Sequence, residues 1–316
     1  MRIYDEMIDT VCFLGSYDPR IGKPIYKGTG FFVWLSDKHV TVVTARHVID
    51  EVPGDEVSIW WNQKSGNIRN SFSKSLWLNH PIKDTAVDVA VLGVALNHEE
   101  LEMDHKGFVS ENFLNEKQEI EREIGAGDVV YFPGLFVAQA GKERNHPIVR
   151  EGIIAAMPQP ISTIVDGEET EVEAYLVEVR SFGGLSGSPV VVTSTPFRRS
   201  QHPAPEEFAD GIKVFQDALI GLVHGHDFME YIVPAQGMQR FNLGLCKVVP
   251  IRYVSEILNG DEMKKVVSDA NAGAITGDQG IRASLDGASI EDDSLTKTAD
   301  LVIEVLEQPK KKGKPQ

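Results

Sequence analysis

The stretch GLSGSP at residues 184–189 lies between two apolar runs that are typical of β-strands. The glycines beside Ser186 let the backbone take unusual torsions and come close to a bound molecule. Two earlier segments, TARH ending at His47 and DVAVL beginning at Asp88, supply partners for the serine hydroxyl. An imidazole can activate a hydroxyl for attack, and a buried carboxylate can hold that imidazole in the required tautomer. The three segments therefore predict a hydroxyl nucleophile with a base and an orienting acid.

Each of these residues also has an ordinary structural interpretation. Ser186 could belong to a plain Ser-Gly turn between strands, and His47 could be a core histidine. We favour catalysis for His47 because the apolar run at residues 40–45 places it at the end of a strand. Asp88 is preferred to Asp84 because apolar residues follow it, as expected of a buried acid that enters a strand. The histidines that lie in polar stretches are expected at the surface: His39, His98, His105, His146 and His202.

The three segments resemble the histidine, aspartate and serine boxes of the trypsin-like serine proteases, which have the chymotrypsin fold. Ser188 stands where the serine box of that family, Gly-X-Ser-Gly-Gly-Pro, has its last glycine. GTGFFV at residues 28–33 resembles the glycine-rich strand before the histidine in bacterial members, including the high-temperature-requirement proteases. VVPI at residues 248–251 resembles their closing strand, which precedes a C-terminal helix. The resemblance covers about residues 8–259 and implies an all-β fold of two six-stranded antiparallel β-barrels with a short C-terminal helix.

The resemblance implies a serine endopeptidase that works through an acyl-enzyme, without a cofactor or a metal. Its catalytic residues would be His47, Asp88 and Ser186, and the backbone N–H groups of Gly184 and Ser186 would form the oxyanion hole. Leu185 departs from the family, because trypsin-like zymogens have an aspartate there that pairs with a new N-terminus. We therefore expect activity without N-terminal processing.

The resemblance also implies substrate-binding residues, namely Arg180, Ser181, His224 and Gly225. Arg180 could favour an acidic residue before the scissile bond through a charge-assisted pair. The alternative is that Arg180 pairs with a surface acid. His224 or His226 could shape the pocket, His224 could contact Asp88, or both histidines could be solvated. The sequence leaves these alternatives open.

The apolar patterning divides the chain into four parts. Residues 1–100 are predicted to form an N-terminal β-barrel, and residues 101–124 an acid-rich, solvated linker between barrels. Residues 125–260 are predicted to form the C-terminal barrel with its helix, and residues 261–316 a flexible tail. Within the tail, a short helix over residues 295–306 is the alternative to disorder and could dock a partner.

Short apolar or alternating runs predict the individual strands. The first barrel is expected to hold strands at residues 10–14, 30–35, 40–44, 57–61 and 87–94. The second is expected to hold strands at residues 128–132, 149–157, 161–165, 171–179, 190–193, 218–223 and 244–249. A short helical turn is predicted directly after His47.

Composition limits the partners that the protein can take. A formal net charge of −16 argues against general affinity for nucleic acid or an anionic membrane, and no run is long enough for a membrane helix. The N-terminus lacks the pattern of a signal peptide, so a cytoplasmic location is expected. Cys12 and Cys246 are expected to be buried, unpaired thiols. A peptide or protein is the expected substrate.

Two other functional classes are alternatives to the protease. A protein-binding module on a protease scaffold usually lacks a triad residue, whereas this chain has all three. An esterase or amidase with the α/β-hydrolase fold would need strands alternating with long helices and the chain order Ser, Asp, His, and neither is present. A metal site is not predicted, because no cluster of histidine, cysteine and acidic residues has ligand spacing along the chain.

Overall fold

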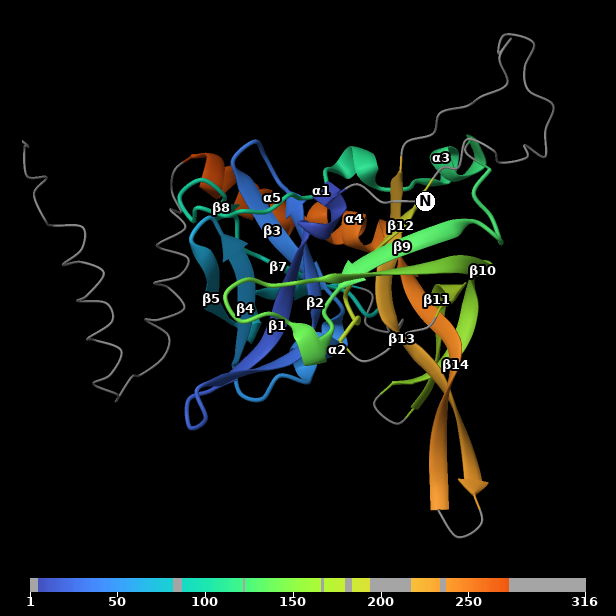
Figure 1. Cartoon of the computed structure of the whole chain (residues 1–316). Coiled ribbons are helices and arrows are strands. Elements are labelled where there is room, and N and C mark those ends of the chain that lie inside the picture. Colours follow the sequence, from blue (N-terminus) through green and yellow to red (C-terminus); the bar gives the residue numbers. More distant parts are fainter. Residues whose placement is uncertain are drawn as a thin grey trace, which may run out of the picture.

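The computed structural model shows two β units packed against each other, with few and short helices (Figure 1). It describes residues 5–81, 87–121, 123–165, 168–179, 184–193, 217–233 and 237–272. The all-β class predicted from the sequence is confirmed. One unit is a closed barrel and the other is a curled sheet.

The first unit is an antiparallel sheet of eight strands. Its strands are β1 (Val11–Asp18), β2 (Lys23–Trp34), β3 (His39–Thr44), β4 (Glu56–Gln63), β5 (Gly66–Ser73), β6 (Trp77–Asn79), β7 (Ala90–Leu92) and β8 (Leu96–Asn97). They follow the order β5-β4-β1-β2-β3-β7-β6, and β8 pairs with β3. The sequence predicts a closed barrel of six strands here, whereas the sheet curls into a half-barrel. The apolar pattern missed β5 and β6 because these strands form the two edges, where fewer side chains are buried.

The second unit is a closed barrel of six antiparallel strands, as predicted. Its strands are β9 (Val129–Gly134), β10 (Ile148–Val165), β11 (Glu168–Glu178), β12 (Pro189–Val192), β13 (Ala218–Val233) and β14 (Gly237–Pro250). The order around the barrel is β10-β11-β14-β13-β12-β9. β13 and β14 continue past the barrel as a long hairpin (Figure 1). β10 joins two strands that the sequence predicts separately, because register shifts near Ala156 let it bend without ending.

The helices are short and lie mostly at the junctions between strands. They are α1 (Asp5–Ile8), α2 (Arg46–Asp50), α3 (Glu116–Glu121), α4 (Arg252–Leu258) and α5 (Asp261–Asn271), with single 3-10 turns at Lys74–Leu76, Ser110–Asn112 and Val137–Gln139. Among the described helices, none has the length and apolar character needed to cross a membrane.

Two expectations about the ends of the β units are wrong. The flexible tail predicted from residue 261 begins with α5, whose Met263 is fully buried against the core. The helix expected over residues 295–306 lies outside the described residues. The acid-rich segment after residue 100 is not a solvated linker, because Phe108 and Leu114 are buried. Its backbone also bonds to both units, through Phe108 to β2 and through Leu114 to β13. Glu102, Asp104, Glu111 and Glu116 are exposed, while the apolar residues anchor the segment.

One continuous hydrophobic core holds the two units together. It includes Phe32 and Val89 of the first unit together with Val190 and Val248 of the barrel, all almost fully buried. Each such side chain contributes about 1.5–3 kcal/mol through its burial. Cys12 and Cys246 are both buried, as predicted, and no disulfide joins them. The shared core fixes how residues from one unit meet residues from the other.

Candidate active site

The pairing of β3 with β7 brings His47 and Asp88 together. Thr44 at the end of β3 lies opposite Ala90 at the start of β7. His47 follows β3 in the first turn of α2, and Asp88 precedes β7. Val48 on α2 is buried and anchors that turn in the core. The short helical turn predicted after the histidine strand is confirmed.

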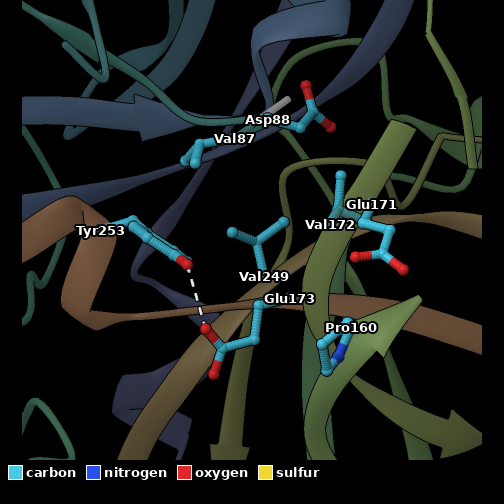
Figure 2. A pocket seen from close by; sticks show the side chains of 8 residues that line it. All are labelled: Val87, Asp88, Pro160, Glu171, Val172, Glu173, Val249 and Tyr253. Carbon is cyan, nitrogen blue, oxygen red and sulfur yellow. Dashed lines mark hydrogen bonds between the residues drawn. The ribbon is translucent and has the colours of Figure 1, made fainter. Parts of the chain in front are cut away.

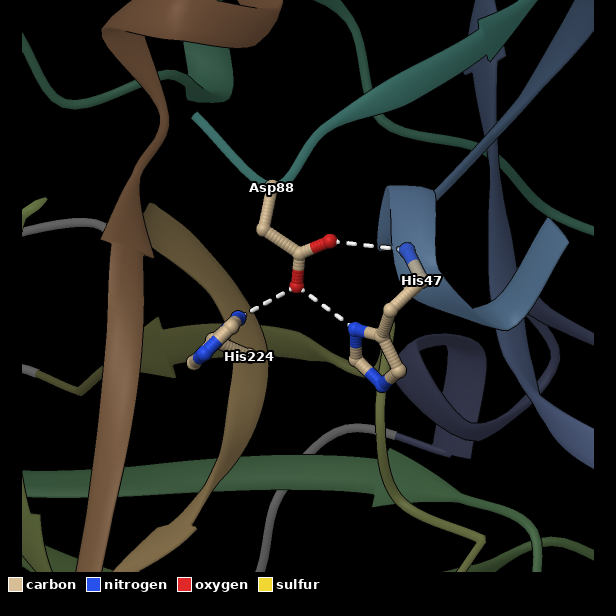
Figure 3. A group of neighbouring side chains, drawn as sticks. All are labelled: His47, Asp88 and His224. Atoms are coloured by element: carbon tan, nitrogen blue, oxygen red, sulfur yellow. Dashed lines mark hydrogen bonds and ion pairs between the residues drawn. The ribbon is translucent and has the colours of Figure 1, made fainter. Parts of the chain in front are cut away.

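His47 contacts Asp88 through two hydrogen bonds (Figure 3). Its backbone N–H donates to Oδ1 of Asp88 over 2.8 Å, and its Nδ1 donates to Oδ2 over 2.7 Å. Asp88 is only 5% exposed, and the His47 side chain is 32% exposed. The two-point contact fixes both the position and the tautomer of the imidazole, and it leaves Nε2 available to accept a proton.

Electrostatics keep this pair in the protonation states that a base and its partner need. Burial alone would raise the pKa of Asp88, but the hydrogen bonds from His224 and His47 hold that pKa well below its usual range. Burial alone would lower the pKa of His47. The hydrogen bond and charge of Asp88, with smaller contributions from Glu51 and Asp50, outweigh burial and raise the pKa above its ordinary value. Asp88 is therefore an ionised acceptor, and His47 is stabilised when it takes up a proton.

His224 brings a second imidazole to the same carboxylate. It lies on β13 of the barrel, and its Nδ1 donates to Oδ2 of Asp88, the oxygen that already accepts from His47 (Figure 3). The two imidazole rings lie edge to face, with centroids 5.6 Å apart. Of the alternatives that the sequence left open for His224, the contact with Asp88 is the one present.

The turn that carries Ser186 is held between the two units. Gly184 and Gly187 have φ values of +103° and +83°, a region that only glycine adopts readily. A Cβ atom on Gly187 would lie 2.1 Å from the carbonyl oxygen of Thr29, so no other residue fits there. The Ser186 carbonyl accepts from the Thr29 N–H over 2.9 Å, and the Gly187 N–H donates to Val223 over 2.8 Å. The glycines that the sequence singled out are therefore required by the geometry.

The Ser186 hydroxyl donates to the backbone carbonyl of His224 over 3.3 Å, and not to His47. This bond is long, and it places the hydroxyl beside the residue whose side chain contacts Asp88. Catalytic hydrogen bonds are often long or misaligned before substrate binds, so the arrangement is compatible with a resting site. Around the same turn, within the described residues, the N–H groups of Gly184 and Ser186 have no acceptor.

The remaining predicted binding residues are only partly described. Arg180 and Ser181 lie outside the described residues. Gly225 follows His224 on β13, is partly exposed, and has open space where a Cβ atom would stand. Its contact with a substrate stays a prediction.

His47, Asp88 and His224 also form a group whose potential metal-donor atoms lie within 4.8 Å of one another. The spacing along the chain did not predict this group because His224 comes from the other β unit. Both Nδ1 atoms already carry protons that they donate to one carboxylate oxygen, and this hydrogen bonding accounts for their approach. A metal ion would have to displace both protons.

A cavity of about 250 Å³ lies beside Asp88 between the two units (Figure 2). It is lined by Val87, Asp88, Pro160, Glu171, Val172, Glu173, Val249 and Tyr253. Two of these residues contact each other, because Glu173 accepts a hydrogen bond from the Tyr253 hydroxyl over 3.2 Å. Neither His47 nor Ser186 lines this cavity, so it is not the place where a substrate would reach the nucleophile.

Two other histidines are buried, one of them against expectation. His105 was predicted at the surface, but it is buried at 7% exposure. Its Nε2 accepts from the Asn62 N–H over 2.7 Å, and its Nδ1 donates to the Asp9 carbonyl over 2.9 Å. Burial lowers the pKa of His105 to about 4. His80, which the sequence did not single out, is buried and lies 2.6 Å from Glu256 of α4. His146 is exposed as predicted, and His202 lies outside the described residues.

Comparisons with known proteins return distant structural similarity. No family model matches the sequence, and no curated protein matches it. The chain is similar to the apo MamO protease domain from Magnetospirillum magneticum, at 16% identity and a TM-score of 0.46, over 82% of this chain and 100% of that one. It is also similar to the active form of the Rv3671c protease from M. tuberculosis, at 18% identity and a TM-score of 0.45, over 80% of each chain. Both are protease structures, but at these identities and scores they assign no family to this chain.

Proposed function

We propose that the chain is a serine endopeptidase in which Ser186 attacks a peptide carbonyl, His47 acts as base and Asp88 stabilises the resulting imidazolium. The observation that carries this proposal is the two-point contact of Asp88 with His47, made beside the glycine turn of Ser186. A carboxylate that accepts from Nδ1 leaves the Nε2 lone pair for a hydroxyl proton. The raised pKa of His47 supports the same role, because the base must hold that proton during the reaction.

The chemistry follows from these groups. As the Ser186 oxygen bonds to the substrate carbonyl carbon, its proton passes to Nε2 of His47. For this step the hydroxyl turns from the His224 carbonyl towards Nε2. The peptide C–N bond then breaks, the leaving amine takes the proton from His47, and Ser186 keeps the acyl group. A water molecule then gives a proton to His47 as its oxygen attacks the ester carbon. The ester C–O bond breaks as His47 passes that proton to the Ser186 oxygen, which releases the acid and restores the hydroxyl.

The N–H groups of Gly184 and Ser186 would bind the oxyanion. They are unoccupied by acceptors within the described chain, and the positive φ of Gly184 helps shape the turn that carries them. A donor of this kind is worth about 3–4 kcal/mol in the transition state. Leu185 between them is buried, so the turn is held by packing and not by a charged pair with a new N-terminus.

The substrate would bind as an added strand along β13. β12 pairs with β13 only as far as Leu222, and among the described strands none covers that edge from His224 onward. An extended peptide can fill such an edge with main-chain hydrogen bonds. Gly225 leaves room for a substrate side chain there. Arg180, preceding the serine turn, would select an acidic side chain before the scissile bond.

A second candidate function is a protein-binding module, silent or activated by a partner. The observation that favours it is the direction of the Ser186 hydroxyl, which bonds to the His224 carbonyl and not to His47. In this alternative, a partner or a substrate strand would be needed to reorient the serine. The C-terminal tail would be a further docking element. A cytoplasmic location remains part of the proposal under either function.

Digestion of a peptide library tests the proposed function and its specificity together. We expect the wild-type protein to cleave peptides, with acidic residues enriched before the cleaved bond. The Ser186→Ala variant should cleave none. Ser188→Ala is the matched control, because this neighbouring serine is fully buried and its hydroxyl has no partner within the described residues. It should cleave like the wild type.

The outcomes separate the candidates. Cleavage by wild type and Ser188→Ala but not by Ser186→Ala supports the endopeptidase. A folded wild-type protein that cleaves no peptide supports the binding module. Cleavage without an acidic preference leaves the endopeptidase in place and removes the role of Arg180.

A further inference from the structure

The carboxylate of Asp88 joins two imidazoles that come from different β units. His47 belongs to α2 of the first unit, and His224 belongs to β13 of the barrel. Both Nδ1 atoms contact the same oxygen of Asp88, while its other oxygen accepts from the backbone of His47 (Figure 3). His224 also contacts the nucleophile, because its backbone carbonyl accepts from the Ser186 hydroxyl. One residue of the barrel therefore touches two of the three proposed catalytic residues.

The protonation pattern of this cluster follows from the donors and acceptors. An ionised carboxylate can only accept, so both Nδ1 atoms must donate. Each imidazole then keeps its proton on Nδ1 and leaves Nε2 free to take another. The donor from His224 on Oδ2 holds the carboxylate, and it also withdraws part of the negative charge that His47 experiences.

We propose that His224 is a positioning residue that holds Asp88 for His47 and tunes the basicity of His47 through the shared carboxylate. This inference rests on the proposed function and adds to it a control of the pH response. Without the donor from His224, Asp88 would keep its two hydrogen bonds to His47 and lose its contact with the barrel. Its full charge would then act on His47, and His47 would hold its proton to higher pH.

The other charged groups that could change the basicity of His47 are few. Asp50 ends α2 and Glu51 caps it, and both act on His47 at longer range. Glu171 of β11 lines the cavity beside Asp88. Each of these is an acid, so each would raise the proton affinity of His47. Among the described residues, His224 is therefore the group that lowers the charge of Asp88 from the barrel side.

Two substitutions of similar size separate hydrogen bonding from packing. His224→Asn places an amide N–H where Nδ1 stands and cannot take a proton, whereas His224→Leu fills the space without a donor. We expect kcat/KM of the leucine variant to fall roughly 10–100-fold, as for a lost hydrogen bond to a charged group. The acid limb of its pH–rate profile should move up by roughly 0.5–1 pH unit. The asparagine variant should recover most of the rate and return the acid limb towards its wild-type position.

A measurement that does not depend on catalysis completes the test. Proton NMR of the wild-type protein in EDTA should show two strongly deshielded imidazole N–H signals, one from each histidine that bonds to Asp88. His224→Asn should remove one of them and His47→Asn the other. If the protein cleaves nothing but both signals are present and lost as described, the shared carboxylate stands and the endopeptidase fails. The proposal is overturned if only one such signal is found. It is also overturned if the His224→Leu and His224→Asn variants have the same rate and the same acid limb, because His224 would then be a packing residue.

Discussion

His47 and His105 are two histidines that lie against the first unit and whose pKa values are shifted in opposite directions. His47 lies against the carboxylate of Asp88, whereas His105 lies between a backbone carbonyl and a backbone N–H. Burial disfavours the charged form in both places. The carboxylate outweighs burial and raises the pKa of His47, while burial prevails at His105 and lowers its pKa to about 4. A charged partner, not burial itself, decides which imidazole can hold a proton.

This difference explains why only one of the two is suited to catalysis. A general base has to become an imidazolium in the transition state, and the protein has to stabilise that charge. Asp88 does so for His47. At His105, Nε2 already accepts from the Asn62 N–H, so a proton there would face another donor. His105 holds the segment after β8 against β4, and its chemistry is structural.

The largest expected effect comes from removing the charge of Asp88, because this charge is what gives His47 a raised pKa when that of His105 is lowered. Asp88→Asn keeps the size of the side chain but removes the negative charge and presents a donor to Nδ1. We expect kcat/KM to fall roughly 10⁴-fold, because His47 would take the wrong tautomer. Steady-state kinetics on a peptide found by library digestion would measure this. An asparagine variant within tenfold of the wild type would contradict the role of Asp88.

The next effect concerns the stability of the fold and His105. In the unfolded chain this histidine has a pKa near 6.5, against about 4 when folded. The unfolded state therefore binds more protons between these values, and the free energy of unfolding falls as the pH is lowered through that window. The loss should be on the order of 3 kcal/mol.

Urea unfolding at several pH values measures this loss. His105→Gln keeps a donor for Asp9 and an acceptor for Asn62, and it should make stability nearly independent of pH between about 6.5 and about 4 apart from the other titrating groups. His146→Gln, at an exposed position, is the control and should keep the wild-type slope. An unchanged slope in His105→Gln would show that His105 is not held neutral.

A smaller effect sharpens the comparison at His47 itself. NMR titration of its ring protons should give a midpoint above the ordinary histidine value of 6.5 in the wild type. In Asp88→Asn, burial is no longer opposed by the carboxylate, so the midpoint should fall below 6.5. A midpoint that does not move would mean that the pair does not set the charge of His47.

The smallest effect comes from the acids around the site. Glu51 is exposed and acts on His47 only through its charge. Glu51→Gln should lower the midpoint of His47 by less than about 0.3 pH unit, because solvent and salt screen exposed charges. A shift as large as that of Asp88→Asn would mean that the general field of α2, and not the direct contact, controls the base.

Much of this arrangement could be predicted from the sequence because it depends on local patterns. The runs before His47 and after Asp88 are apolar enough to indicate strands, and the glycines around Ser186 indicate a special turn. The all-β class and the helical turn of α2 follow from such patterns. The closed second barrel and the grouping of His47 with Asp88 were implied by the resemblance to the trypsin-like proteases, and the pairing of β3 with β7 that brings these two residues together is visible only in the structure.

The remaining features depend on residues that are distant in the chain. His105 lies in a polar stretch, and only its packing against Asn62 and Phe32 buries it. The contact of His224 with Asp88 joins the two β units, so no spacing within one segment predicts it. The edge strand β5 has a weak apolar pattern, and Met263 is buried by a core that the tail sequence does not reveal. In each case tertiary packing outweighed the local signal.

Labelling with a fluorophosphonate tests the central claim most directly, because this reagent bonds to a serine only where a neighbouring base activates it. Mass spectrometry of the wild-type protein near neutral pH should show one adduct, and peptide mapping should place it on Ser186. The adduct should be absent from Ser186→Ala and strongly slowed in Asp88→Asn. A folded wild-type protein that carries no adduct on Ser186 would contradict the proposal that His47, Asp88 and Ser186 act together as a catalytic site.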